Sequence, residues 1–143
     1  MRMAILHNTT RGVDLAARCG VADSFWSRLR GLLGQPQLRE GQGLLITPCR
    51  AVHMMGMKYA IDVVFLDREG RVVGLEPRLE PRAKSAWYPR ARHALELPAG
   101  TVEATGTRLG DVITIDRLVG DSFPEDVDDI AEGREAVSIT GAA

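Results

Sequence analysis

The hydrophobic and polar positions along the chain change their period several times, and most segments favour β-strands. The clearest signal is a pair of β-branched runs, 61–66 and 71–75, on either side of the sequence Asp-Arg-Glu-Gly. A tight turn containing glycine between two such runs is typical of a β-hairpin. Shorter strand-like runs lie at 3–7, 13–19, 43–48, 49–54, 93–100 and 108–115. The pattern therefore predicts a mainly β chain.

One segment follows a helical period instead. Phe25, Leu29 and Leu32 lie three or four residues apart, which places them on one face of a helix. A capping residue precedes them, and Gly34 can end the helix. We therefore expect one short amphipathic helix over residues 24–33.

Many short strands, one helix and turns roughly every 8–12 residues predict a compact β-sandwich or a partly open barrel. A doubly wound α/β fold would need more helical crossovers than this pattern offers. The periodic pattern ends after Ile115, and the remaining sequence is acidic and rich in small residues. We expect one β domain over residues 1–117 and a disordered, flexible acidic tail over residues 118–143.

Composition excludes some classes of partner. The 143 residues carry 18 basic and 19 acidic side chains, a formal net charge of −1. Such a balance gives no overall field that attracts nucleic acid, and no window approaches the ~18 apolar residues of a membrane span. We expect a cytoplasmic monomer that binds neither nucleic acid nor membrane. Its two cysteines, Cys19 and Cys49, are then free thiols.

Four segments, taken in order, resemble a known family. They are RLRGLLG, LREGQGLLITPCRAVHMMGMKYAIDVVFLDREGRVV, ARHALELPAG and RLGDVITI. The series resembles the DUF192 family, also called UPF0127, a group of small bacterial and archaeal domains, over roughly residues 3–115. The resemblance implies a compact, mainly β, sandwich-like domain. It implies no catalytic residues, because the function of the family is unknown.

Cys49 and His53 are the first candidates for chemistry, since a thiol and an imidazole can form a catalytic or metal-binding pair. The preceding Pro48 disfavours a helix here. On a strand, residues four apart are separated by about 13 Å, too far for a direct contact. The pair can act only if a turn folds it back, and the alternative is a buried cysteine with a hydrogen-bonded or exposed histidine.

The sequence His-Met-Met-Gly-Met, 53–57, offers soft ligands of the kind that suit Cu(I). Methionine is also the adaptable filler of irregular cores, and Gly56 indicates a turn at this point. No cysteine or histidine cluster completes a tetrahedral set, so we expect core or pocket-lining methionines and no metal or other cofactor.

Asp62 lies at the head of an apolar strand, where a carboxylate is costly without partners. It could accept backbone N–H groups in a bend, or form the polar floor of a pocket with Lys58 and His53. Glu96 alternates with leucines and so faces away from them, toward solvent or toward a second layer. Trp87, within a basic stretch at 78–92, could grip a ligand or pack on the sheet and hold down a solvated loop.

The leading hypothesis is a non-enzymatic module that binds an unknown small ligand or peptide near the turn at 53–62. The polar groups beside a strand include no recognisable nucleophile, base and orienting group. One alternative is a thiol- or metal-dependent enzyme that uses Cys49 or His53, and another is a structural protein-interaction domain. The predicted ligand-binding residues are His53, Met57, Lys58, Asp62 and Trp87.

Overall fold

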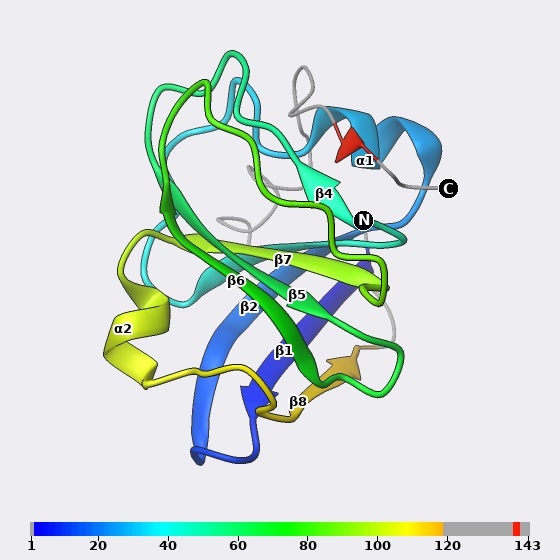
Figure 1. The fold of residues 1–143 in the computed structure, drawn as a ribbon, viewed down its shortest axis with the longest axis vertical. Coiled ribbons are helices and arrows are strands. Elements are labelled where there is room, and N and C mark those ends of the chain that lie inside the picture. The colour runs from blue at the N-terminus through cyan, green and yellow to red at the C-terminus, as the bar shows by residue number, and fades with distance from the viewer. Residues whose placement is uncertain (1, 119–138, 141–143) are drawn as a thin grey trace.

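The computed structural model describes residues 2–118 and 139–140, which fold into a mainly β domain with two short helices (Figure 1). No helix in this part of the chain is long and apolar enough to cross a membrane. The elements in chain order are β1 (Arg2–Asn8), β2 (Val13–Ala22), α1 (Phe25–Arg30), β3 (Gln42–Ile46), β4 (Ala51–Val52), β5 (Ile61–Leu66), β6 (Val72–Leu79), β7 (His93–Pro98), α2 (Thr101–Thr105), β8 (Ile113–Arg117) and β9 (Ile139–Thr140).

Seven strands form one curled sheet in the order β6-β5-β7-β3-β2-β1-β8. All neighbours are antiparallel except β2 and β3, which are parallel because α1 and a loop connect them. The two outer strands approach each other at one end, where Val72 N–H donates to the Asp111 carbonyl and Ile113 N–H to the Gly70 carbonyl, each at 2.8 Å. The sheet is therefore a half-barrel, which confirms the predicted partly open barrel.

Both faces of the central strands are covered, which explains why every residue of β3 and β5 is buried. One core lies inside the curl, since its residues come from both outer regions of the sheet, including Leu6, Val72 and Ile113. The second core lies on the other face, beneath a cap made of the segments 32–38, 49–59 and 79–91. Figure 1 shows α1, β4 and the long loops on this side of β7. We refer to this second core as the cap core.

Helix α1 is shorter than its period predicts. Ser24 caps it through a 3.1 Å bond from Ser27 N–H to its hydroxyl, and Gly31 ends it with a φ of 50°. Phe25 and Trp26 remain 61% and 67% exposed. The buried anchor is instead Leu32, which follows the helix and enters the cap core. The expected apolar face is therefore supplied by the turn after the helix and not by the helix itself.

The predicted hairpin is present as β5 and β6, and the Asp67 carboxylate accepts hydrogen bonds from two N–H groups of its turn. The long segment between β6 and β7 is held by Tyr88, whose ring stacks on Phe65 with centroids 4.4 Å apart. Its hydroxyl donates to Glu76 at 2.8 Å. Trp87, which could either grip a ligand or pack on the sheet to hold this loop down, is 54% exposed.

The predicted tail, residues 118–143, lies outside the described residues except at Leu118 and at β9. Strand β9 pairs with β4, with Thr140 opposite Ala51 and Ile139 opposite Val52. The other side of β4 is occupied by the loop before β7, because Ser85 N–H donates to the Val52 carbonyl at 2.8 Å. Strand β4 therefore has a neighbour on both sides.

Candidate functional site around Glu96

Glu96 is the most unusual polar residue in the cap core. It lies in the middle of β7, with Leu44 of β3 and Val63 of β5 as its neighbours across the sheet. Leu95 and Leu97, the residues on either side of it, face the inside of the curl. Glu96 alternates with them and therefore points to the opposite face, into the cap core. Of the two environments considered for this side chain, solvent and a second layer, the structure shows the second layer.

The Glu96 carboxyl group is fully buried, and neither of its oxygens has a hydrogen-bond partner among the described residues. Burial disfavours the charged form and raises the pKa of this carboxyl to about 8. An unpartnered buried polar group costs about 1–3 kcal/mol, and more when it is charged. Native proteins seldom keep such a group without a partner such as a water or an ion. Glu96 therefore marks a position where a hydrogen-bonding partner is expected.

Two ionisable side chains of the cap lie near this carboxyl. Burial, and secondarily the charge of Glu96, raises the pKa of Tyr59 to about 12. Burial, opposed by a bond to a backbone carbonyl and reinforced by Glu96, raises the pKa of the Cys49 thiol to about 12. Both groups are neutral at the pH where Glu96 titrates, so neither changes its charge. Burial alone sets the pKa of the carboxyl.

A second unpartnered group lies on the segment that carries Leu32 and Leu38 into the cap core. The Gln35 side chain is buried, and its Nε2 has no hydrogen-bond partner among the described residues. Gln35 lies between two residues of the cap core, Leu32 and Leu38. Tyr59 connects this segment to the site, since its hydroxyl donates to the carbonyl of Pro36 at 3.2 Å. The cap core thus contains an unused amide donor as well as unused carboxyl acceptors.

The predicted methionine group is divided between core and surface. Met54 and Met57 are buried in the cap core, whereas Met55 is 57% exposed. Gly56, with a φ of 84°, makes the turn between them, and Met57 N–H donates to the Met54 carbonyl at 3.1 Å. Two thioethers therefore line the layer that holds Glu96.

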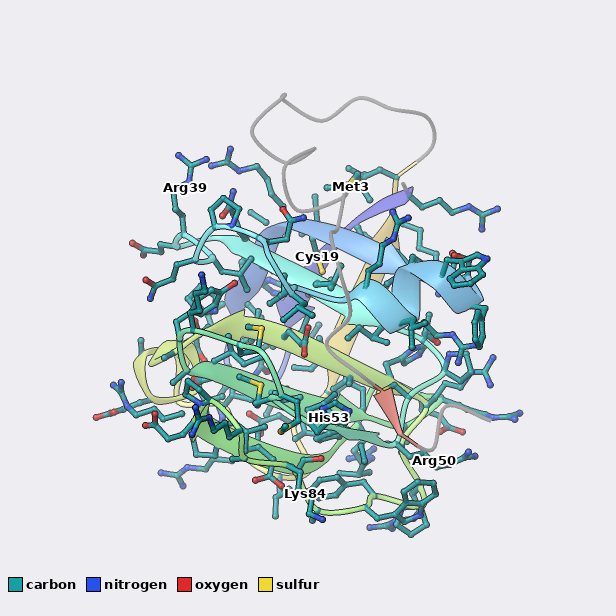
Figure 2. The ribbon with its side chains drawn as sticks, turned by 90° about the horizontal axis from the view of Figure 1, so that it is seen from above. Met3, Cys19, Arg39, Arg50, His53 and Lys84 are labelled. Atoms are coloured by element: carbon teal, nitrogen blue, oxygen red, sulfur yellow. The ribbon has the colours of Figure 1, made fainter. Side chains whose placement is uncertain are left out.

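The other predicted site residues do not converge on one point. His53 is half-buried and pairs across an isolated bridge with Lys84, and Figure 2 shows these two residues in the same part of the molecule. Burial lowers the pKa of His53. Lys58 and Trp87 are exposed.

Asp62 lies on the opposite face of the sheet from Met57 and has a structural role. One carboxylate oxygen accepts from Arg78 N–H and the other from Val102 N–H, each at 2.8 Å. Val102 belongs to α2 and to the core inside the curl. The carboxylate pins a bulge between β5 and β6 and fastens α2 to the sheet. Asp62 thus accepts backbone N–H groups in a bend, the first of its two expected roles, and it is not positioned to share a pocket with Met57.

Cys49 is not an activated nucleophile. Its side chain is fully buried, and its thiol donates to the Ala51 carbonyl at 3.2 Å. The pKa of about 12 keeps it protonated at neutral pH, whereas the thiolate is the reactive form. The nearest polar contact of the His53 ring is with Met55 N–H, at 3.4 Å. In the described residues, no three side chains among histidine, cysteine, aspartate and glutamate are grouped to hold a metal.

Comparison with known proteins identifies the family. A family model described as an uncharacterized ACR, DUF192, matches residues 6–115. The chain belongs to the DUF192 family. A UPF0127 protein of Thermococcus sibiricus is 31% identical over 116 residues, which cover 76% of this chain and 73% of the relative. A UPF0127 protein of Pyrococcus furiosus is 31% identical over 119 residues, which cover 78% of this chain and 98% of the relative.

Two solved structures share the DUF192 fold of this chain. A protein of unknown function from Novosphingobium aromaticivorans superposes with a TM-score of 0.63 at 17% identity, over 78% of this chain and 83% of its own. A protein from Sinorhizobium meliloti superposes with a TM-score of 0.65 at 24% identity, over 80% of this chain and 92% of its own. At these identities the likeness shows the fold alone. The family and the fold are established, and the molecular function is not.

The sequence pattern placed Glu96 on its face of the strand but did not assign it to the ligand-binding site. The available signal was a carboxylate in the middle of the short strand His-Ala-Leu-Glu-Leu-Pro, which is otherwise apolar after its first residue. Alternation gave the face on which it lies, but only the cap made of distant segments shows that this face is buried.

Proposed function

We propose that this DUF192 domain is a non-enzymatic binding module for a small ligand, which it takes between the sheet and the turn at 53–62. The observation that carries the proposal is the Glu96 carboxyl group, fully buried with no hydrogen-bond partner for either oxygen among the described residues. A ligand that donates hydrogen bonds would satisfy these oxygens, and the site needs no activated nucleophile to do so.

The turn at 53–62 is the proposed entrance. Met54 and Met57 line its inner side, and thioether side chains adapt readily to an inserted group. His53 and Lys58 lie on the outer side, partly or fully exposed to water. Of the five residues predicted from sequence, these two and Met57 belong to the proposed site, while Asp62 supports the sheet and Trp87 lies on the neighbouring loop. A cytoplasmic location and a monomeric state stay predictions.

A titration followed by NMR tests the proposal. The methyl groups of the methionines are labelled in the full chain, which is titrated with methylguanidinium, butylammonium, N-methylurea and acetate in separate experiments. We expect at least one compound to give saturable shifts of the Met54 and Met57 methyl signals, with Met3 on β1 as an internal reference. If none of the four compounds shifts the two cap methionines, the proposed site is wrong.

A second candidate, peptide binding, is supported by the pairing of β9 with β4. Main-chain hydrogen bonding at a strand edge is a common way to hold an extended peptide. In this reading the segment Ile139–Thr140 occupies a position that a partner peptide can also take.

Competition distinguishes this candidate from the first. Val52 directs its N–H and carbonyl toward Ser85, so Thr140, opposite Ala51, forms the hydrogen-bonded pair with β4. The variant Thr140→Pro therefore weakens the pairing of β9, because proline cannot donate a hydrogen bond to a ladder. The peptide Ala-Val-Ser-Ile-Thr-Gly-Ala-Ala, the sequence of residues 136–143, should then bind the full-length variant more tightly than the unaltered chain. Equal binding to both proteins, or binding to neither, would exclude an exchangeable strand site at β4.

A further inference from the structure

We propose that the group bound at Glu96 is a single organic cation with N–H donors, an alkylammonium or a guanidinium, and that its arrival displaces the proton of the carboxyl group. This inference rests on the proposed function and specifies its ligand class.

The surroundings of the carboxyl set the charge of the ligand. The neighbouring side chains from β3 and β5 are Leu44 and Val63, both apolar. From the cap, the ionisable groups that sense Glu96 are Cys49 and Tyr59, and both are neutral at neutral pH. The Arg28 cation of α1 lowers the pKa of Cys49 but is not among the causes that shift the pKa of Glu96. An ionised Glu96 is thus a single negative charge in an apolar layer, which one monocation neutralises. A divalent metal would need further ligands, and no group of three suitable side chains occurs in the described residues.

The lining also suits an organic cation better than a hydrated inorganic one. Thioethers and a tyrosine ring, supplied by Met54, Met57 and Tyr59, border the layer. These groups pack against alkyl stems and against the faces of delocalised cations. The Nε2 of Gln35, between Leu32 and Leu38 of the cap core, is a further buried donor without a hydrogen-bond partner among the described residues.

Binding is coupled to the release of a proton. Without ligand, burial raises the pKa of Glu96 to about 8, so the carboxyl is mostly protonated at pH 7. When the cation binds, the O–H bond breaks, the carboxylate accepts the N–H donors of the ligand, and the proton passes to the buffer. The charge in the layer stays at zero, and one cation replaces one proton.

Calorimetry with a matched pair of probes tests this coupling. Methylguanidinium and N-methylurea have the same shape, but only the first is charged. For methylguanidinium at pH 7, about 0.9 proton should be released per ligand bound. The apparent enthalpies measured in phosphate and in Tris should therefore differ by about 0.9 times the difference between the ionisation enthalpies of the two buffers. Its affinity should rise roughly tenfold per pH unit from pH 6 to 7 and level off above pH 8.

Variants separate the charge from the fold. Glu96→Gln keeps the shape of the side chain but cannot ionise, so it should lose at least tenfold in affinity for methylguanidinium and show no proton release. Glu103→Gln is the control, because Glu103 lies on α2 with a side chain that is 85% exposed, and it should behave as the unaltered chain does.

The outcomes distinguish this inference from the proposal beneath it. Binding of N-methylurea as tight as that of methylguanidinium, with no proton release, would overturn the cationic class and leave a ligand site at Glu96. A failure of every charged and neutral probe to reach the cap methionines would overturn both. Unchanged methylguanidinium binding in Glu96→Gln would overturn the assignment of the charge to this residue.

Discussion

Replacing Glu96 by glutamine should abolish a large pH dependence of stability. The carboxyl has a pKa of about 8 in the folded chain and 4.5 as its ordinary value. Between these values the folded state holds a proton that the unfolded state has released, so the free energy of unfolding falls as pH rises. The stabilisation is complete below pH 4.5, declines by about 1.4 kcal/mol per pH unit, and is gone above pH 8.

Because Glu96 is fully buried, its contribution to the free energy of unfolding should fall by about 3–4 kcal/mol between pH 5 and pH 8. His93 acts in the opposite direction, because burial, reinforced by nearby arginines, lowers its pKa to about 4. Its unfolded form binds a proton below pH 6.5 that the folded form does not, so its contribution to stability increases as pH rises to that value. The unaltered chain and Glu96→Gln share this contribution, and it cancels in their difference.

The assay is urea unfolding of both proteins at pH 5, 6, 7 and 8, with the free energy of unfolding extrapolated to water. The glutamine amide adds an offset that does not depend on pH, so the informative quantity is how the difference between the two proteins changes with pH. We expect the variant to gain about 3–4 kcal/mol relative to the unaltered chain from pH 5 to pH 8. Parallel curves for the two proteins would refute the reasoning, because they would show that Glu96 is ionised, solvated or paired in the folded chain.

Three further predictions concern the fold and the thiol. A Cβ at Gly70 would overlap the Ile113 carbonyl where the outer strands meet, so Gly70→Ala should lower the free energy of unfolding by about 3 kcal/mol. The control Gly12→Ala has a similar positive φ but open space around it, and it should cost about 1 kcal/mol; equal losses would contradict the role of the contact. Asp62→Asn should lower the free energy of unfolding by about 2–4 kcal/mol, because one of the two carboxylate acceptors at 2.8 Å is replaced by an amide donor that faces an N–H. An unchanged free energy of unfolding would contradict the role of Asp62 in pinning the bulge and α2. Cys49 should resist maleimide in the native state and react in urea, as followed by mass spectrometry, because it is fully buried; rapid native labelling would revive a thiol-based activity.

The local pattern of the sequence was sufficient to predict those elements whose structure depends on residues close together in the chain. The hairpin of β5 and β6 depends on two β-branched runs and a turn whose aspartate bonds its own backbone, and these features are local. The predicted helix, residues 24–33, is longer than α1 because the helical period of the sequence continues past Gly31, where a positive φ ends α1. Leu32, which continues this period, lies beyond the end of the helix and packs in the cap core.

The composition of the site depended on contacts between distant segments. Asp62 and Met57 are close in sequence, yet alternation in β5 sends Asp62 to the face of α2, while the turn places Met57 on the face of the cap. Sequence alone determined that Glu96 faces away from its leucine neighbours. The tertiary structure decided that this face is buried, because the segments 32–38, 49–59 and 79–91 close over it. Burial of a carboxyl group is a property of everything packed around it and not of its own strand.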